Sequence, residues 1–482
     1  MNEGTSRDAR HANRRNWGFA VLCLGILMNA LNSTNVQMAL AAIGADLHSS
    51  EASLAWVINV YLIVYGGCLL LGGRLGDLLG NRRMFVSGAG AFTLGSLICG
   101  LSTSVAMLIA ARALQGIGAS IVSAMGLSLI MELFPDARQR AKALGIYALV
   151  GACGNGTGML LGGLVTSALG WHWVFFSTVP AGIILCGASY AFLPSTRSIG
   201  KSKHLDIAGA AAATTSIMLA VYGILLSSHD GERNHTLAAL TGSLLLFVLL
   251  IGIEGQAKNP LIPLRLLQKR GLLVAIALGS LLSAIALAWT FAATLYLQRV
   301  LSWSPLQTGM GFLPANLVTA LIAFVVAPRL IAQFGIGRPL VIGFSSIAFG
   351  LTLIARALGS SSVVPDGVAG MLLVGMGVGL TYGPVVLGAV NSVAPDEVGA
   401  ASGIVNTSFA VGGALGLAIL AAIAGARTGH LLQSGAALPI ALRSGYRLAL
   451  QGGAALAAAA CLISGVFFLA STGRRPQIQP VQ

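Results

Sequence analysis

The chain has 482 residues, of which 56% are hydrophobic and 9% are charged, and its formal net charge is +14. Soluble globular domains carry about 25% charged residues, so this composition excludes an ordinary soluble domain and indicates a membrane protein with many spans. The basic excess would suggest a nucleic-acid partner in a soluble chain. Here the basic residues lie in short loops at alternate ends of apolar runs, so we expect no nucleic acid.

The amino-terminal segment, residues 1–16, is polar and rich in arginine. The apolar run after it is too long for the hydrophobic region of a secretory signal and lacks a convincing cleavage site, so we expect the amino terminus to stay in the cytoplasm. The six cysteines all lie inside apolar runs without CxxC spacing. This placement favours small core residues over disulfides or metal ligands, and we expect neither a metal nor a cofactor.

Fourteen apolar segments follow one another along the chain, each near the roughly 20 residues that an α-helix needs to cross a bilayer. They lie near residues 17–40, 52–72, 84–101, 105–131, 142–168, 173–193, 207–227, 236–253, 271–295, 306–327, 339–357, 368–392, 400–424 and 448–470. With this even number, most lysines and arginines fall on the side of the amino terminus. The positive-inside rule then predicts two cytoplasmic termini, and we expect the membrane to be the inner (plasma) membrane of the cell.

The loop between the second and third spans, LLGGRLGDLLGNRRMF, is short, charged and rich in glycine. Its residues Gly73, Asp77, Gly80, Arg82 and Arg83 have the spacing of the loop signature of the major facilitator superfamily, and the loop resembles that signature closely. The resemblance implies a cytoplasmic gate in which Asp77 is the negative element and the two arginines are the positive ones. An ordinary basic cytoplasmic turn is the alternative interpretation.

The first and fourth spans also resemble the multidrug efflux branch of this superfamily. In that branch an acid precedes a Ser-Thr pair in the first span, whereas this chain has Asn32 before Ser33 and Thr34. Arg112 and Gln115 match the fourth-span motif, whose arginine faces the central cavity. An arginine inside a span is costly to bury and normally faces protein or water. The alternative is that Arg112 extends to the nearby membrane surface.

The fifth span, in the segment GACGNGTGMLLGGLVTSALGW, carries Gly154, Gly158, Gly162 and Gly163. Small residues at this spacing allow a neighbouring helix to approach closely. The segment resembles the glycine-rich antiporter motif of efflux members, although Met159 stands where that motif has proline.

The seventh and eighth spans resemble the inserted helices of the fourteen-span drug:proton antiporter branch. The resemblance implies an all-α major facilitator fold with two six-helix bundles and two inserted central helices. The predicted organisation is a tail at 1–16, a first bundle at 17–193, a linker with two extra spans at 194–270, a second bundle at 271–470 and a tail at 471–482.

The acidic residues all fall in loops or at span ends, and none is predicted at the membrane midplane. Proton-coupled export needs a titratable group whose environment changes during transport, and Asn32 cannot titrate. Asp46 and Glu132 could lie deeper than their positions indicate, or coupling could run through Asp77 and the gate. The third alternative is transport without proton coupling.

The missing acid leaves Arg112 without an evident carboxylate partner. An unpaired cavity arginine would attract an anionic substrate; alternatively, Asn32, Asn35, Gln115 and backbone carbonyls hold it. The predicted cavity is otherwise apolar and rich in amides. Its further hydrogen-bonding candidates are Tyr61, Asn316, Tyr382 and Asn406.

Together these features predict a monomeric transporter, surrounded by membrane lipid, that exports drugs or small amphipathic metabolites by alternating access with protons as the coupling ion. One alternative is a dedicated exporter or facilitator of a single metabolite, which could be anionic, without proton coupling. The other is a membrane sensor that does not transport. We expect no enzymatic activity, because no nucleophile triad, metal cluster or phosphate-binding loop is evident.

Overall fold

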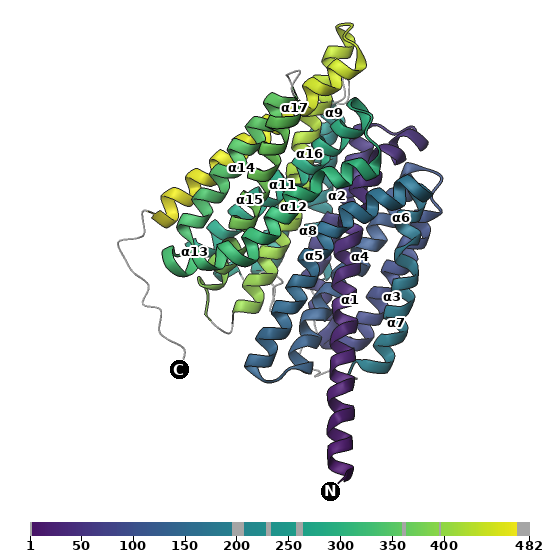
Figure 1. The fold of residues 1–482 in the computed structure, drawn as a ribbon, viewed down its shortest axis with the longest axis vertical. Coiled ribbons are helices and arrows are strands. Elements are labelled where there is room, and N and C mark those ends of the chain that lie inside the picture. Colours follow the sequence, from purple (N-terminus) through teal and green to yellow (C-terminus); the bar gives the residue numbers. More distant parts are fainter. Residues whose placement is uncertain are drawn as a thin grey trace.

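The computed structural model describes residues 2–194, 207–227, 233–256, 264–358, 363–394 and 397–469. Within these ranges every regular element is a helix (Figure 1). The amino-terminal half consists of α1 (Asn2–Asp46), α2 (Glu51–Leu79), α3 (Asn81–Gly100), α4 (Val105–Leu133), α5 (Ala137–Leu169), α6 (His172–Phe176) and α7 (Thr178–Phe192). Two central helices, α8 (Ile207–Leu226) and α9 (Arg233–Gln256), follow.

The carboxy-terminal half contains three π-helical segments as well as α-helices. Its elements are α10 (Leu264–Leu267), α11 (Arg270–Leu295), η1 (Tyr296–Val300), α12 (Pro305–Leu321), η2 (Ile322–Val326), α13 (Ala327–Phe334), α14 (Gly337–Ala357), α15 (Val363–Val390), α16 (Val398–Gln433), α17 (Leu438–Ser464) and η3 (Gly465–Leu469). Figure 1 shows this half, from green to yellow, beside the purple and blue amino-terminal half.

Twelve helices within the described residues are long and apolar enough to cross a membrane, whereas the sequence predicts fourteen spans. The two predicted spans outside the twelve correspond to α3 and α8. Helix α3 begins with the polar residues Asn81, Arg82 and Arg83, and the apolar part of α8 that qualifies by composition is the shorter segment Ala212–Leu226. The protein is therefore an all-helical, multi-pass membrane protein.

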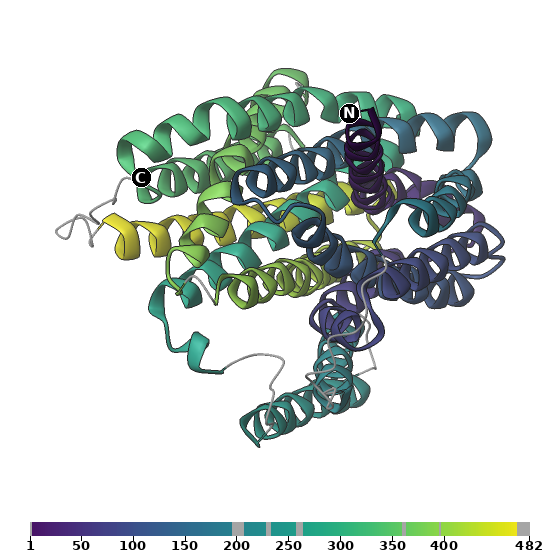
Figure 2. The ribbon, with the colours of Figure 1, turned by 90° about the horizontal axis from the view of Figure 1, so that it is seen from below.

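The central helices α8 and α9 form a hairpin at one side of the molecule. Figure 2 shows this teal pair at the edge of the molecule. Helix α8 packs against α9, α2 and α16, so the hairpin contacts both halves through α8.

Several helices begin at a side chain that caps their first turn. The side chains of Ser50, Ser104 and Asp136 accept hydrogen bonds from backbone N–H groups in the first turns of α2, α4 and α5, respectively. Ser304 and Gln307 form a reciprocal capping box at the start of α12. Such caps satisfy backbone donors that the helix itself leaves unpaired, and they fix where each connecting turn ends.

An ion pair joins the starts of two helices in the carboxy-terminal half. Lys269, just before α11, donates to Glu397 Oε2, just before α16, at 2.5 Å. This hydrogen bond lowers the pKa of the Glu397 carboxyl, because the ammonium stabilises its charged form.

The turns between helices gather at two ends of the molecule. The distal end is where α1 ends at Asp46, and the proximal end is where α2 meets α3 at Gly80. Figure 1 places the turn between α16 and α17 at the distal end as well. Gly80 has a φ of 92°, a conformation that favours glycine, and it allows the sharp proximal turn.

Close helix packing in the amino-terminal half depends on glycines in α5. A Cβ atom added to Gly158 would lie 2.0 Å from Thr34 Oγ1, and one added to Gly162 would lie 2.6 Å from Asn35 Cα. Gly154 packs against Ala30 in the same way. Helix α5 therefore lies against α1 at backbone distance, whereas Gly163 lies against Pro305 at the start of α12.

We predict that Gly162→Ala lowers the free energy of unfolding by about 1–3 kcal/mol, because the new methyl group would collide with backbone that cannot rotate away. Gly145→Ala is the matched control in the same helix, since no atom lies within 4 Å of its added Cβ. The control should be neutral or stabilising by up to about 1 kcal/mol. Thermal unfolding of the purified protein in detergent measures both, and equal melting temperatures would contradict the packing argument.

Candidate functional site

Arg112 of α4 is the largest fully buried side chain of the described residues, with 1% of its surface exposed. Its Nη1 donates to Asn32 Oδ1 of α1 at 2.6 Å and to Gln115 Oε1 at 2.9 Å, and its Nε donates to the Val57 carbonyl of α2 at 3.0 Å. The guanidinium also lies over the Tyr61 ring, 4.2 Å from the ring centroid. The arginine thus joins three helices and does not extend to a surface.

Short contacts between α2 and α4 bring Arg112 within reach of its partners. A Cβ atom on Gly116 would lie 2.8 Å from the Tyr61 carbonyl oxygen, so only glycine permits this approach. Gln115 extends the network to α3, because its Nε2 donates to Ser96 Oγ at 2.7 Å. Arg112 and Gln115 share a helix face at i and i+3, and both point into the amino-terminal half.

A second polar chain runs beside the arginine. The Tyr61 hydroxyl donates to Asn29 Oδ1 of α1, and Asn29 Nδ2 donates to Ser123 Oγ of α4 at 2.9 Å. The Tyr61 ring also stacks with Tyr65 at a centroid distance of 6.2 Å. Tyr61 is one of the predicted cavity residues and Asn29 is not, although Asn29 lies about one helical turn before Asn32 in the same span.

Whether this cluster can exchange protons depends on the groups that accept hydrogen bonds from Arg112. Its hydrogen-bond acceptors among the described residues are two side-chain amides and a backbone carbonyl, which cannot take up or release a proton near neutral pH. The cluster can hold one fixed positive charge and orient amide groups. Asn32 Nδ2 is buried without a partner among the described residues, which leaves one donor for another ligand.

The other predicted cavity residues lie apart from Arg112. The Asn35 amide, in the orientation that satisfies its groups, donates to the Leu31 and Gly158 carbonyls and joins α1 to α5. Asn316 of α12 donates to Met159 Sδ of α5 at 3.5 Å, across the two halves.

In the carboxy-terminal half, the side chain of Tyr382 in α15 is 53% exposed, and its ring lies 5.2 Å from that of Phe409 in α16. Asn406 is partly buried in α16. Of the eight predicted cavity residues, Asn32, Tyr61, Arg112 and Gln115 therefore form one direct cluster, and within the described residues the other four have partners elsewhere or none that links them to it.

The predicted gate residues lie at the proximal turn. The Arg82 guanidinium lies over the Tyr190 ring, 5.1 Å from its centroid, while the Arg83 side chain is exposed. The backbone of α2 includes Gly73 and Asp77, but their surroundings and the Asp77 side chain lie outside what the structure describes.

The remaining predicted proton carriers lie at opposite ends. Asp46 is at the distal end, where its Oδ2 accepts a hydrogen bond from Trp171 Nε1 at 3.0 Å. Glu132 is at the proximal end, where its Oε1 accepts a hydrogen bond from Asn81 Nδ2 at 2.5 Å.

One acid that is not among the predicted site residues, Glu51, is partly buried. The sequence puts it at the start of the second predicted span, and its side chain is only 15% exposed and contacts Arg299 and Tyr446 of the other half. No signal in the sequence pairs these residues, because they are separated by most of the chain.

Residues 22–417 match the family described as the Major Facilitator Superfamily. The chain belongs to the major facilitator superfamily. The predicted family is therefore confirmed, and the protein is a transporter and not an enzyme.

Relatives of this superfamily member include antibiotic resistance and export proteins. It is 33% identical to the puromycin resistance protein of Streptomyces alboniger, over 88% of this chain and 84% of that one. It is 34% identical to the cephamycin export protein of Amycolatopsis lactamdurans, over 84% of each chain. Identity to the tetracenomycin C resistance and export protein of Streptomyces glaucescens is 32%, over 85% of this chain and 76% of that one.

Solved structures show the same superfamily fold at low sequence identity. A bacterial homologue of the human lysosomal transporter Spinster, in an inward-facing and unoccupied conformation, superposes with a TM-score of 0.68 at 14% identity, over 97% of this chain and 99% of that one. The POT family transporter PepTSo superposes with a TM-score of 0.68 at 12% identity, over 95% and 99%.

We predict that Asn32→Leu lowers the free energy of unfolding by about 1–3 kcal/mol, because it removes one acceptor from a buried guanidinium. Asn32→Asp keeps an acceptor at the same place and adds a charge that Arg112 can pair with, so this variant should retain wild-type stability. Thermal unfolding in detergent compares the two. The network would be refuted as a stabilising element if the leucine variant melted at the wild-type temperature.

Proposed function

We propose that this protein exports drugs or small amphipathic metabolites across the cell membrane by alternating access. The observation that carries the proposal is its 32–34% identity, over most of its length, to proteins named for antibiotic resistance and export. The substrate would move from the proximal side to the distal side. A single chain would suffice, with membrane lipid around it.

The proposed topology has fourteen spans, formed by the twelve qualifying helices together with α3 and α8. Support comes from the packing of α3 against α4 and α7, and of α8 against α2 and α16, because these partners are themselves long and apolar enough to cross a membrane. The two bundles would be residues 17–193 and 271–470, and 194–270 would form the inserted linker. Both termini and the proximal end would face the cytoplasm of a bacterial-type inner membrane, as the basic loops favour.

The proposed substrate cavity lies between the halves and is bordered by the Arg112 cluster and by Asn35, Asn316, Tyr382 and Asn406. Contacts of Asn316 with α5 support a position at the boundary of the two halves. An apolar cavity with a few amide and hydroxyl groups suits substrates that are largely hydrophobic with scattered polar atoms. Transporters of repeated architecture place their sites at such a boundary.

We propose proton-coupled antiport, with Asp46, Asp77 and Glu132 as the candidate carriers. Amide chemistry at Asn32 rules that position out as a carrier, so the proton must use a carboxylate elsewhere in the chain. Glu132 and the last turn of α2, which carries Asp77, both lie at the proximal end, where Glu132 accepts a hydrogen bond from Asn81.

We predict that the purified protein in liposomes accumulates substrate only while a pH gradient is imposed, and that uptake is matched by proton movement in the opposite direction. Puromycin as a basic probe and a cephamycin as a carboxylated one would be tested with and without a protonophore. Loss of accumulation when the gradient collapses establishes antiport.

A second candidate function is facilitated transport of one metabolite without proton coupling, and the amide at Asn32 is the observation that favours it. Flux that persists without a gradient would support this candidate and contradict antiport. In one version of this candidate the substrate is an anion, and the positive charge of Arg112 attracts it. Transport of the carboxylated probe alone, abolished in Arg112→Ala, would support that version.

We predict that Asp77→Asn reduces transport by roughly tenfold, the effect of losing about 1.4 kcal/mol of gate stabilisation, without preventing membrane insertion. Asp136→Asn is the matched control, because Asp136 lies near the same end and asparagine caps helix α5 as well as aspartate does. Initial rates in liposomes, normalised to inserted protein, measure the effect. Full activity of the Asp77 variant would refute the gate.

A further inference from the structure

Glu51 is an acid of the amino-terminal half whose side chain contacts the carboxy-terminal half directly. It is the first residue of α2, at the distal end, directly after the capping residue Ser50. Its Oε1 accepts a hydrogen bond from the Tyr446 hydroxyl of α17 at 2.5 Å and lies 3.5 Å from Arg299 Nη1 of η1. Both contacts cross from one half of the molecule to the other.

Arg299 reaches Glu51 because the end of α11 continues as the π-helix η1. A Cβ atom on Gly44 of α1 would lie 2.5 Å from Arg299 Nη2, so the guanidinium rests directly on the last turns of α1. The preceding residue, Gln298, donates from Nε2 to the Met38 carbonyl of α1 at 3.1 Å. Single-turn π-helices recur at functional sites, where they redirect side chains from the regular helix surface.

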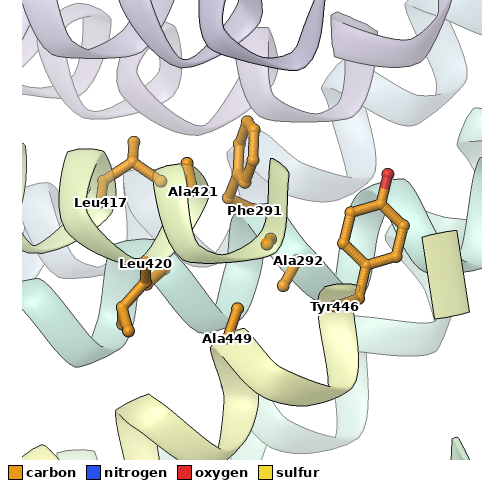
Figure 3. Close-up of a pocket in the computed structure, with 9 residues that line it drawn as sticks. Phe291, Ala292, Leu417, Leu420, Ala421, Tyr446 and Ala449 are labelled. Atoms are coloured by element: carbon orange, nitrogen blue, oxygen red, sulfur yellow. The ribbon is translucent and has the colours of Figure 1, made fainter. Parts of the chain in front are cut away.

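Tyr446 is held from the other side by small apolar residues. Its ring is 0% exposed and borders a small apolar void together with Ala292, Ala449 and Phe291. Figure 3 shows the hydroxyl pointing away from this void. The tyrosine is therefore fixed by packing within its own half, and only its hydroxyl is presented to the other half.

The two oxygens of the Glu51 carboxylate differ. Oε1 has both partners, whereas Oε2 is buried without a hydrogen-bond partner among the described residues. A buried, unpartnered carboxylate oxygen is unfavourable while the group is charged, and a proton on it removes the charge. The site is thus built to hold the ionised form through one oxygen and to accept a proton on the other.

We propose that Glu51, Arg299 and Tyr446 form a latch that closes the distal side of the transport pathway, and that a proton from the distal solution, bound at Glu51 Oε2, releases it. The proposal rests on the alternating-access function proposed above. Ionised Glu51 attracts Arg299 and accepts a strong hydrogen bond from Tyr446, so the latch is closed. Protonated Glu51 loses the attraction to Arg299, so acid on the distal side favours opening.

The charged groups around Glu51 support the prediction that acid opens the latch. Arg299 and Tyr446 are the charged and titratable groups that act on the carboxylate. Asp46, at the end of α1, is engaged by Trp171 of its own half, and His48 is exposed in the turn before α2. Arg443, one turn before Tyr446, is exposed, and its charge interacts electrostatically with Tyr296 of η1.

The test is a distance measurement between spin labels at Ser49 and Ala436, one in the distal turn of each half, with the exposed Cys153 replaced by serine. Double electron–electron resonance would be recorded at pH 5, 7 and 9. For the otherwise unchanged protein we expect one short distance at high pH and a longer component that grows as the pH falls.

Glu51→Gln should show the longer component at every pH, with an open-to-closed ratio at pH 9 raised roughly tenfold over that of the parent, because the ion pair is gone. Arg299→Gln should have the same effect, and the double variant should open no further, because both substitutions remove the same pair. Tyr446→Phe keeps the ring in place and should open the latch to a smaller extent.

Asp136→Asn is the control, since it removes a carboxylate far from the latch, at the proximal end, and asparagine caps α5 as well as aspartate does. It should keep the pH dependence of the parent. The latch is overturned if Glu51→Gln and its parent give the same distances at pH 5 and pH 9, or if the effects of the two single variants add. The measurement needs no substrate, so the latch can fail while the gradient-driven flux succeeds, and the reverse.

Discussion

A single buried guanidinium organises the amino-terminal half. Arg112 is 1% exposed, and its donors require acceptors from α1, α2 and α4 at hydrogen-bond distance. A charge that is removed from water must be compensated by such acceptors, or burial would be prohibitively costly. The positions of three helices are therefore linked to one side chain.

Glycine supplies the space that this arrangement needs. Gly116 lets α4 approach α2 closely enough for Arg112 to reach the Val57 carbonyl, and Gly158 and Gly162 let α5 approach α1. In a membrane the hydrophobic effect does not drive helices together, so backbone proximity and interhelical hydrogen bonds contribute more of the packing. The polar network around Arg112 and the glycine contacts thus together hold the helices of this half against one another.

The contacts between the halves include close glycine packing, as at Gly163 against Pro305, and also polar contacts. At the distal end they include an ion pair, a tyrosine hydrogen bond and the Gln298 contact with α1. Interactions with charged, partly accessible groups can be broken and formed again when conditions change, whereas a close-packed apolar interface resists separation. A transporter that alternates between two shapes needs an interface of the first kind on each side of its cavity.

The sequence by itself determined the membrane class, the helical fold and the superfamily, because apolar run length, basic loops and the glycine-rich motif at 73–83 are local patterns. It also indicated that Arg112 and Gln115 share a face, since a spacing of three residues fixes this on a helix. Only the tertiary structure decided which groups hold Arg112 and that Glu51 meets Tyr446, 395 residues away. Contacts between distant segments depend on how whole helices pack, and no local pattern encodes that packing.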